Sequence, residues 1–300
     1  MTTVDAHHHF WDPGRADYPW LTDELASIRR PFGPNDLRPV LAAEAIDRTV
    51  LVQTRSSVEE TEEFLVTAAD EEFIAGVVGW VDLTDPGVAE QIARLRDLKG
   101  GGRLVGIRHQ AHDEPDPEWL IRADVMRGLH AVEQAGLVFD LLVRTRELPA
   151  ALSVASTLPG LRFVVDHIAK PPIASGALEP WAGRLRPLGE RPNVMCKVSG
   201  MVTEADLSTW TTDDLRPYVD VVLEVFGPDR LMFGSDWPVC LLAATYAQVV
   251  DATRELLGDL SAAERRMIFG GTAAKTYALE VAQAVGEPYG LGEPSRPDTA

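Results

Sequence analysis

Three consecutive histidines, His7 to His9, lie within the first ten residues of the chain, in the stretch VDAHHHFWDP. A run of three between an apolar lead and an aromatic pair is too short for a usual purification tag. Two interpretations remain: a metal site, or histidines that are hydrogen-bonded near a core. Side chains alternate between the faces of a strand, so His7 and His9 would share one face. Two imidazoles so placed at a strand end can bind one metal ion.

Ionisable residues follow several other apolar runs. RFVVDHIAKP contains Asp166, His167 and Lys170, RLMFGSDWPVC contains Asp236, LVGIRHQ ends in Arg108, His109 and Gln110, and NVMCKVSG contains Lys197. Any one of them could be a helix cap, a turn former or a solvated charge. Clustered charges destabilise a fold unless they are paired or used, so their shared position at strand ends favours a functional site.

The elements that must position these residues repeat one unit. Eight short apolar runs predict strands at residues 3–9, 49–54, 73–81, 104–110, 137–143, 162–167, 193–198 and 231–235. Between them lie segments with the apolar spacing of helices, among them 58–71, 88–98, 125–134, 148–158 and 215–226. Eight alternations of strand and helix predict an α/β fold, a (β/α)8 TIM barrel. The main rival is a doubly wound open sheet, which usually has a glycine-rich phosphate loop where this chain has histidines.

One domain is expected to span most of the chain. No internal linker or low-complexity tract interrupts residues 1–285, so we assign them to the barrel domain. The stretch GEPYGLGEPSRPDTA is rich in glycine, proline and charge, and residues 286–300 are predicted to be a flexible C-terminal tail. The connection from the first strand to Asp47 is long for a barrel and is expected to fold over the C-terminal rim, where barrel enzymes keep their chemistry.

Composition limits the classes of partner. The 300 residues carry 46 acidic and 28 basic side chains, a formal charge of −18 that repels phosphate backbones and anionic membranes. No apolar run approaches the length of a membrane span, and the start lacks the pattern of a signal peptide. Cys196 and Cys240, the only cysteines, are interpreted as reduced thiols. We expect a cytoplasmic protein that binds neither nucleic acid nor membrane. No feature of the sequence predicts an oligomeric state.

The motifs at the strand ends resemble those of a known family. The stretches DAHHHFWD, GIRHQAHDEPDPEWL, DHIAKPP, CKVSG and FGSDWPVC are similar to segments of the amidohydrolase superfamily (amidohydrolase 2 type), in the branch of sugar-acid lactonases that resembles L-fuconolactonase and L-rhamnonolactonase. The likeness covers nearly the whole chain up to about residue 280. It implies a distorted (β/α)8 barrel and hydrolysis of a cyclic ester, with a small-molecule lactone as the substrate.

The resemblance also implies roles for individual residues. The superfamily's metal-ligand positions fall on His7, His9, His167 and Asp236, and its substrate-contacting positions fall on Arg108, His109 and Lys197. Two-metal members have a bridging lysine or glutamate at the end of strand four, where this chain has Arg108 to Gln110. One divalent ion, with zinc first among the candidates, is therefore expected at most. Members of the branch differ in whether a metal is needed, so a metal-free site remains open.

Each group can be given a task suited to its chemistry. Asp236 is the candidate general base for attack of water on the lactone carbonyl. His167, Arg108 or His109 can stabilise the oxygen that becomes negative. Trp11, Trp20 and Trp119, in predicted rim loops, offer apolar faces to a sugar ring or pack loop against barrel.

Three functions besides that of a sugar-acid lactonase remain open. One is a metal-dependent decarboxylase of the same superfamily, and another is a hydrolase of a muconolactone-like or pyrone dicarboxylate lactone. The third is a barrel that binds sugar acids without catalysis and needs no base at Asp236.

Overall fold

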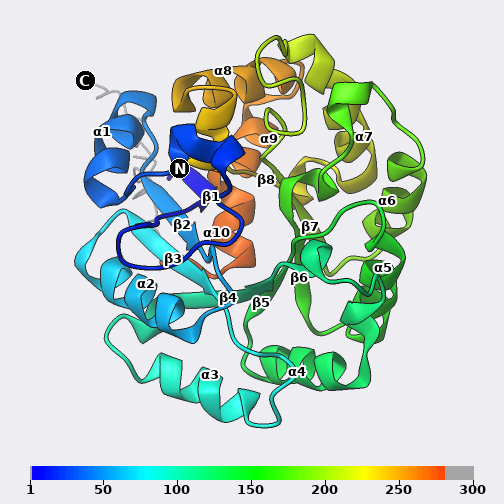
Figure 1. The fold of residues 1–300 in the computed structure, drawn as a ribbon. Helices are drawn as coiled ribbons and strands as arrows, with labels where there is room; N and C mark the ends of the chain where they lie inside the picture. Colours follow the sequence, from blue (N-terminus) through cyan, green and yellow to red (C-terminus); the bar gives the residue numbers. More distant parts are fainter. Residues whose placement is uncertain (1, 281–300) are drawn as a thin grey trace, which may run out of the picture.

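The computed structural model describes residues 2–280, in which eight parallel strands follow one another around a single sheet (Figure 1). The strands are β1 (Val4–His8), β2 (Arg48–Val52), β3 (Ile74–Gly79), β4 (Leu104–His109), β5 (Val138–Leu141), β6 (Arg162–Val165), β7 (Val194–Val198) and β8 (Leu231–Phe233). Each overlaps one predicted run, and most end one or two residues earlier than predicted. The predicted (β/α)8 barrel is confirmed.

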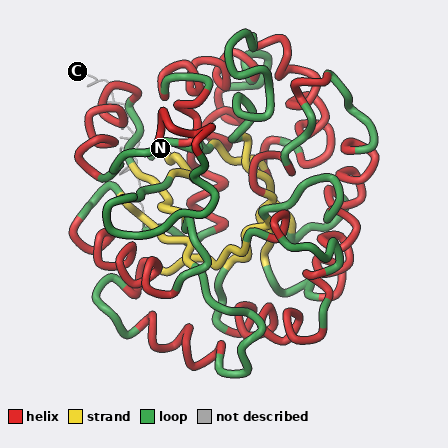
Figure 2. Tube along the Cα trace, in the orientation of Figure 1, coloured by secondary structure: helices red, strands yellow, loops and turns green. Residues whose placement is uncertain are grey.

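Helices surround the ring of strands, and Figure 2 shows them outside the sheet with loops between. They are α1 (Pro34–Glu44), α2 (Val58–Asp70), α3 (Val88–Arg96), α4 (Ala123–Gln134), α5 (Leu148–Thr157), α6 (Trp181–Gly189), α7 (Thr212–Phe226) and α8 (Tyr246–Leu256). All five helical segments named from the sequence are present. The helices bury apolar faces against the outer faces of the strands, so the outward-facing strand residues are apolar.

The barrel closes through the first and last strands at their C-terminal ends. The Asp236 backbone N–H donates to the His7 carbonyl at 2.8 Å, and the His9 N–H donates to the Trp237 carbonyl at 2.7 Å. The register of β1 against β2 shifts between Asp5 and His8. The residues proposed for chemistry are therefore also those whose backbones join the two ends of the sheet.

The barrel interior is filled mainly by small and β-branched side chains, as a packed core rather than a pore. Its cluster comprises Val4, Ala6, Val50, Val52, Ala75, Val78, Val138, Val164, Met195, Met232, Ala273, Tyr277 and Leu279. The last three come from the C-terminal segment that contains α9 (Ala262–Arg266), a π-helical turn (Met267–Gly271) and α10 (Thr272–Thr276). In Figure 1, α10 lies within the ring of strands. The predicted tail, 286–300, lies outside the described residues.

The loop after β1 is long, as expected, and contains a 3-10 turn at Asp23–Ile28 before α1 begins. Its two ends are joined by reciprocal backbone hydrogen bonds between Trp11 and Phe32, of 3.2 and 2.9 Å. None of the helices in residues 2–280 combines the length and the apolar character that a membrane span requires.

Candidate active site

Four buried side chains from three strand ends meet at the C-terminal rim. We call His7, His9, His167 and Asp236 the rim cluster. The Nε2 atoms of His7 and His9 are 3.1 Å apart. Asp236 Oδ1 lies 3.3 Å from His9 Nε2, 3.8 Å from His7 Nε2 and 3.9 Å from His167 Nε2. The structure therefore brings together all four predicted metal ligands.

Hydrogen bonds at Nδ1 orient the rings of His9 and His167 so that the Nε2 atom of each faces the other side chains of the rim cluster. His9 Nδ1 lies 2.8 Å from the Val52 carbonyl, and His167 Nδ1 lies 2.9 Å from Ser199 Oγ. A ring that donates through Nδ1 keeps its lone pair on Nε2. Burial lowers the pKa of His7 and that of His167 well below the usual range, so both rings are neutral.

The backbone that carries two of these residues is strained. Residues His167 to Lys170 all have positive φ, between 47° and 61°, and Asp236 has a φ of 57°. Such conformations cost non-glycine residues about 1–3 kcal/mol each and cluster at functional sites. This left-handed turn ends β6 before His167, which is why the predicted strand over 162–167 is too long.

Glycines allow close contact with the rings. A Cβ at Gly200, whose φ is +61°, would lie 2.6 Å from His167 Nδ1. A Cβ at Gly234 would lie 2.7 Å from the Cβ of His7. Both positions therefore exclude a side chain behind the rim cluster.

The spacing of His7, His9 and Asp236 fits one tetrahedral ion. Ligands at about 2.0–2.1 Å from zinc lie about 3.3–3.4 Å apart, and the ligand atoms of these three residues lie 3.1–3.8 Å from one another. His7, His9 and Asp236 form one candidate metal-binding triad among the described residues. Neutral imidazoles with a carboxylate are the donors that zinc prefers.

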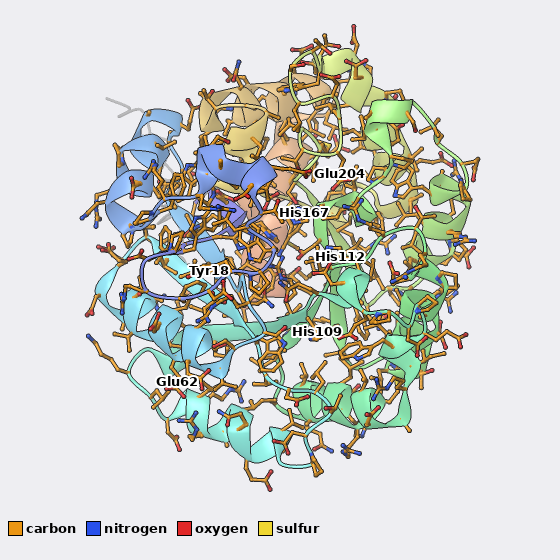
Figure 3. The ribbon with its side chains drawn as sticks, in the orientation of Figure 1. Tyr18, Glu62, His109, His112, His167 and Glu204 are labelled. Carbon is orange, nitrogen blue, oxygen red and sulfur yellow. The ribbon has the colours of Figure 1, made fainter. Side chains whose placement is uncertain are left out.

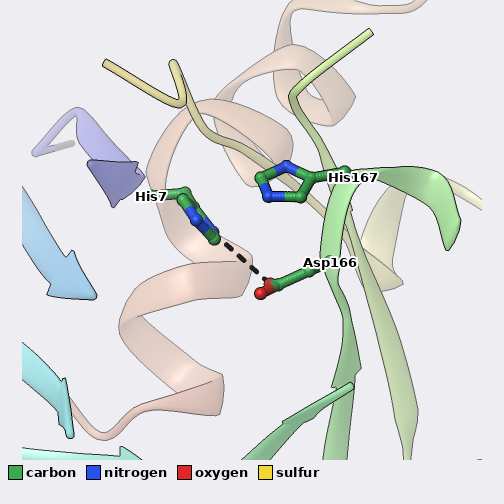
Figure 4. Close-up of side chains that lie close together, drawn as sticks. All are labelled: His7, Asp166 and His167. Atoms are coloured by element: carbon green, nitrogen blue, oxygen red, sulfur yellow. Dashed lines mark ion pairs between the residues drawn. The ribbon is translucent and has the colours of Figure 1, made fainter. Parts of the chain in front are cut away.

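A second candidate triad consists of His7, Asp166 and His167 (Figure 4). Its carboxylate is already engaged, because Asp166 lies 3.0 Å from Arg108 Nη1 and 2.9 Å from Lys197 Nζ. Arg108 Nη1 also lies 3.2 Å from His7 Nε2. Because Arg108 and Lys197 already pair with Asp166, whereas Asp236 lines a cavity, the first triad is the better ion site.

Asp236 is poised to act as a base. Burial on its own raises the pKa of its carboxyl, but the neighbouring His167 and His9 outweigh burial, and the pKa lies below its ordinary value of 3.8. The side chain is 3% exposed and lines a cavity at the rim. An ionised carboxylate therefore faces the space where a substrate can bind.

A second set of buried charges lies beneath the rim. We call Lys197, Asp140, Asp166 and Tyr277 the interior ion cluster. Lys197 Nζ lies 2.6 Å from Asp140 Oδ2, 2.9 Å from Asp166 Oδ1 and 3.1 Å from His7 Nδ1. The Tyr277 hydroxyl lies 2.9 Å from both oxygens of Asp140. Lys197, predicted to bind substrate, is fully buried here and does not line the cavity.

Arg108 connects the two clusters. Besides contacting His7 and Asp166, it donates through Nη2 to Gln53, to the side-chain oxygen at 3.0 Å and to the backbone carbonyl. Its Nε is buried and has no hydrogen-bond partner among the described residues. The guanidinium is thus oriented by the protein and also lines the cavity.

The cavity beside the rim cluster has a volume of about 170 Å³. It is lined by His9, Trp20, Leu25, Thr54, Arg108, Gln110, His112, Asp113, Leu142, His167, Lys170, Asp236 and Val239. Trp20 and Leu25 come from the loop after β1, so that loop covers the site as the sequence predicted. The side chains combine charged groups, hydrogen-bonding groups and a few apolar surfaces, which suits a small polar molecule.

Three predicted substrate contacts lie away from this cavity. His109 stacks on Trp119 with ring centroids 4.0 Å apart, and its two nitrogens contact Trp80 Nε1 at 3.0 Å and Glu114 at 2.8 Å. Trp11 is 3% exposed and donates to the Ile28 carbonyl. Figure 3 labels His109, His112 and His167, all three near the centre of the view.

Sequence reasoning missed four residues that shape the site: Gln53, Asp140, Asp166 as an ion-pair partner, and His112. Asp166 had a local signal, because it directly precedes His167 at a strand end. His112 also had one, since it follows β4 within the motif RHQAHDEP. Gln53 and Asp140 lie in apolar strands or at their ends, where one polar residue predicts no particular partner.

Comparisons with known proteins place the chain in a family. The family model described as Amidohydrolase matches residues 4–279. The L-fucono-1,5-lactonases of Burkholderia multivorans and Burkholderia ambifaria are 42% and 41% identical to the chain over 287 residues, which cover 92% of this chain and 96% of each relative. A crystal structure of an amidohydrolase from Burkholderia multivorans with bound zinc has a TM-score of 0.88 at 41% identity, covering 93% of this chain and 100% of that one.

Proposed function

The chain belongs to the amidohydrolase family, and we propose that it hydrolyses the ring ester of a sugar-acid lactone. The observation that carries the proposal is the buried carboxylate of Asp236, which faces a small polar cavity between imidazoles and beside Arg108. The names of the two Burkholderia relatives give the same reaction class. Those names favour neither a decarboxylase, nor a hydrolase of pyrone or muconolactone rings, nor a barrel that binds sugar acids without catalysis.

Asp236 is the general base. Water is a poor nucleophile, so its proton must leave as the oxygen bonds to the lactone carbonyl carbon. The ionised carboxylate accepts that proton. When the bond between the carbonyl carbon and the ring oxygen breaks, the protonated Asp236 returns the proton to the departing oxygen, and the product is a hydroxy acid.

Arg108 stabilises the charge that develops on the carbonyl oxygen, whereas His167, a neutral ring that keeps a lone pair on Nε2, is suited to hold an ion instead. The Arg108 guanidinium is held in place by Gln53 and Asp166, so little reorganisation is needed during reaction. Its unpaired Nε–H supports a further bond to substrate oxygen. His109, Lys197, Trp11 and Trp119 lie outside the cavity wall, and we propose that they support the site rather than touch the reacting atoms.

The rim cluster is our proposed site for one divalent ion, with zinc first among the candidates. Such an ion would polarise the carbonyl and promote ionisation of water. We expect elemental analysis to find at most about one transition-metal ion per chain, because Arg108 and Lys197 occupy the surroundings of the second triad. His7→Ala and His9→Ala should both lower metal content and turnover. Two tightly bound ions would contradict the single-ion site, and full activity after chelation would favour hydrolysis without a metal.

The substrate class can be tested with a panel of lactones. Polar groups in the cavity suit an oxygen-rich ring, and each one left unpaired costs about 1–3 kcal/mol. An L-fucono-, L-rhamnono- or L-galactono-lactone should therefore be hydrolysed with a kcat/KM at least about a hundredfold higher than that of γ-butyrolactone. A pH indicator detects the proton that each hydrolysis releases. Equal efficiency on sugar and aliphatic lactones would refute the sugar-lactonase proposal.

One variant links that preference to a residue. Arg108→Met keeps the length of the side chain and removes its donors. It should lose most of the advantage of sugar lactones over γ-butyrolactone. Arg127→Met, which alters an exposed arginine that bonds the Thr84 carbonyl, is the matched control and should keep it.

We also propose that the enzyme acts in the cytoplasm, in carbohydrate metabolism, without nucleic acid or membrane partners. Cys196 and Cys240 are both buried free thiols, which is usual for a reducing compartment. The charge of −18 opposes binding to polyanions.

A further inference from the structure

Three residues of the cavity wall have a buried nitrogen without a hydrogen-bond partner among the described residues. Arg108 Nε belongs to the catalytic groups, and the other two are Trp20 Nε1 and His112 Nδ1. Other polar residues of the wall are already engaged: Gln110 bonds Gln53 and the Thr54 carbonyl, and Lys170 bonds Glu204 at 2.8 Å. Buried polar groups in native proteins are nearly always paired, so these two need an explanation.

Trp20 can only donate. Its indole ring packs edge-on against Trp11, with centroids 5.1 Å apart, and also contacts Tyr18 at 6.3 Å. The ring is therefore held by aromatic neighbours, and its N–H has no partner among the described residues although Trp20 lines the cavity. An indole nitrogen donates one hydrogen bond and accepts none.

His112 is suited to accept. Burial lowers the pKa of its imidazole to about 4, so the ring is neutral at pH 7. Its Nε2 lies 3.4 Å from Asp113 Oδ1, and this neighbouring carboxylate favours the tautomer with the proton on Nε2 and a lone pair on Nδ1. The His112 backbone N–H donates to the Leu142 carbonyl at 3.2 Å, which holds the residue on the cavity wall.

We propose that Trp20 and His112 form a subsite for ring hydroxyl groups of the lactone, separate from the groups that act on its ester. A hydroxyl accepts from an indole N–H and donates to an imidazole lone pair, whereas a methylene group does neither. The subsite therefore selects hydroxylated over deoxygenated rings. This inference rests on the lactonase function proposed for the same cavity.

Paired variants and paired substrates test the subsite. Trp20→Phe and His112→Leu should each lower kcat/KM about tenfold on L-fucono-1,5-lactone. On one monodeoxy analogue, which lacks the hydroxyl that the residue binds, the same variant should change kcat/KM by less than about twofold. His112→Asn keeps an acceptor atom and should recover activity on L-fucono-1,5-lactone relative to His112→Leu.

Two matched controls remove the same groups elsewhere. Trp210→Phe deletes an indole N–H that already bonds the Ala243 carbonyl at 2.9 Å, and His130→Leu deletes an exposed imidazole on α4. Both should leave the preference for hydroxylated lactones unchanged. Thermal unfolding checks each variant, and if Trp20→Phe does not fold, the His112 variants decide.

The outcomes separate the subsite from the lactonase function. Equal loss on every lactone, including γ-butyrolactone, would show a structural role and overturn the subsite while leaving the lactonase function intact. No loss on any lactone would overturn it as well. If the unaltered chain hydrolyses no lactone, the lactonase proposal fails, and the subsite fails with it.

Discussion

The rim cluster and the interior ion cluster occupy the same barrel, yet their groups are paired in different ways. In the interior ion cluster, Lys197 faces two carboxylates, and Tyr277 bonds one of them. In the rim cluster, Asp236 Oδ1 lies 3.3–3.9 Å from the Nε2 atoms of three imidazoles, and His9, His167 and Asp236 line a cavity. The charges of the interior ion cluster are paired with neighbouring side chains and do not line that cavity. The side chains of the rim cluster instead surround a point where a ligand can bind.

His7 belongs to both environments. Its Nδ1 faces Lys197 and Asp166, and its Nε2 faces His9 and Arg108. The interior ion cluster therefore orients a ring whose other nitrogen belongs to the rim. Both clusters are buried and charged. The way in which their groups are paired is therefore what distinguishes a cluster that stabilises the fold from one that can catalyse a reaction. Changes in the interior should affect folding most, and changes at the rim should affect turnover most.

The largest expected effect follows from Lys197→Met. The variant leaves Asp140 and Asp166 buried without their shared cation, and removing one partner of a buried pair costs about 3–5 kcal/mol. We expect the free energy of unfolding in urea to fall by about that amount. Lys99→Met, which removes an exposed pair with Asp70, is the control and should unfold like the parent chain. A loss below about 1 kcal/mol in Lys197→Met would mean that the interior ion cluster does not support the fold.

Asp236→Asn should show the opposite pattern. The amide keeps the size of the side chain and the backbone bond to His7, but it cannot accept the proton of water. We expect kcat to fall about 10²-fold or more, equivalent to about 2.7 kcal/mol, with little change in the unfolding midpoint. Asp82→Asn, in the loop after β3, controls for loss of a carboxylate at the same end of the barrel. A folded Asp236→Asn enzyme with more than about a third of parental activity would remove Asp236 from its role as base.

The fold and the rim could be predicted because their signals are local. Each strand is an apolar run that stops at a polar residue or turn, and parallel strands of a barrel end on the same rim. Those two facts place His7, His9, His167 and Asp236 together without knowledge of any contact. The left-handed turn at His167 had no such signal, since no residue of the segment DHIAKP is a glycine.

The ion pairs of the interior ion cluster could not be predicted from the sequence in the same way. Asp140 is one acid in the apolar stretch VFDLLV, and its partners Lys197 and Tyr277 lie 57 and 137 positions away. Only closure of the barrel brings them together. By contrast, alternation along β4 could have shown that Arg108 and His109 face opposite ways. Arg108 takes the inward position, and His109 packs against Trp119.

Gly200→Ala tests whether the strained rim depends on its glycine. The backbone at Gly200 has a positive φ, which is strained for alanine, and an added Cβ would lie 2.6 Å from His167 Nδ1. We expect a loss of about 2 kcal/mol in the free energy of unfolding and about a tenfold fall in kcat, because the His167 ring must shift. Gly136→Ala has a similar φ of +68° with nothing within 4 Å, so it should lose stability but keep its kcat. If the two variants keep the same kcat, contact with Gly200 does not position His167.

The smallest effects are expected from variants that remove a single buried hydroxyl. Tyr277→Phe removes one from the interior ion cluster. Burial, together with Asp140, holds the pKa of Tyr277 well above 10, so its phenol is protonated and donates. Phenylalanine keeps the ring in the apolar interior and deletes one bond to a charged group, for a loss of about 1.5 kcal/mol in unfolding free energy.

Tyr246→Phe is the matched comparison for that variant. The Tyr246 hydroxyl also donates to a buried carboxylate, that of Asp5, at 3.0 Å. Asp5 keeps three further donors, Ser235 N–H, Ser235 Oγ and His7 N–H, whereas Lys197 is the one donor left to Asp140 within residues 2–280. Tyr246→Phe should therefore lower the free energy of unfolding by less than Tyr277→Phe, and both should keep kcat within about threefold, or about 0.7 kcal/mol. If Tyr246→Phe loses more unfolding free energy than Tyr277→Phe, the number of donors that remain on the buried carboxylate does not determine the destabilisation.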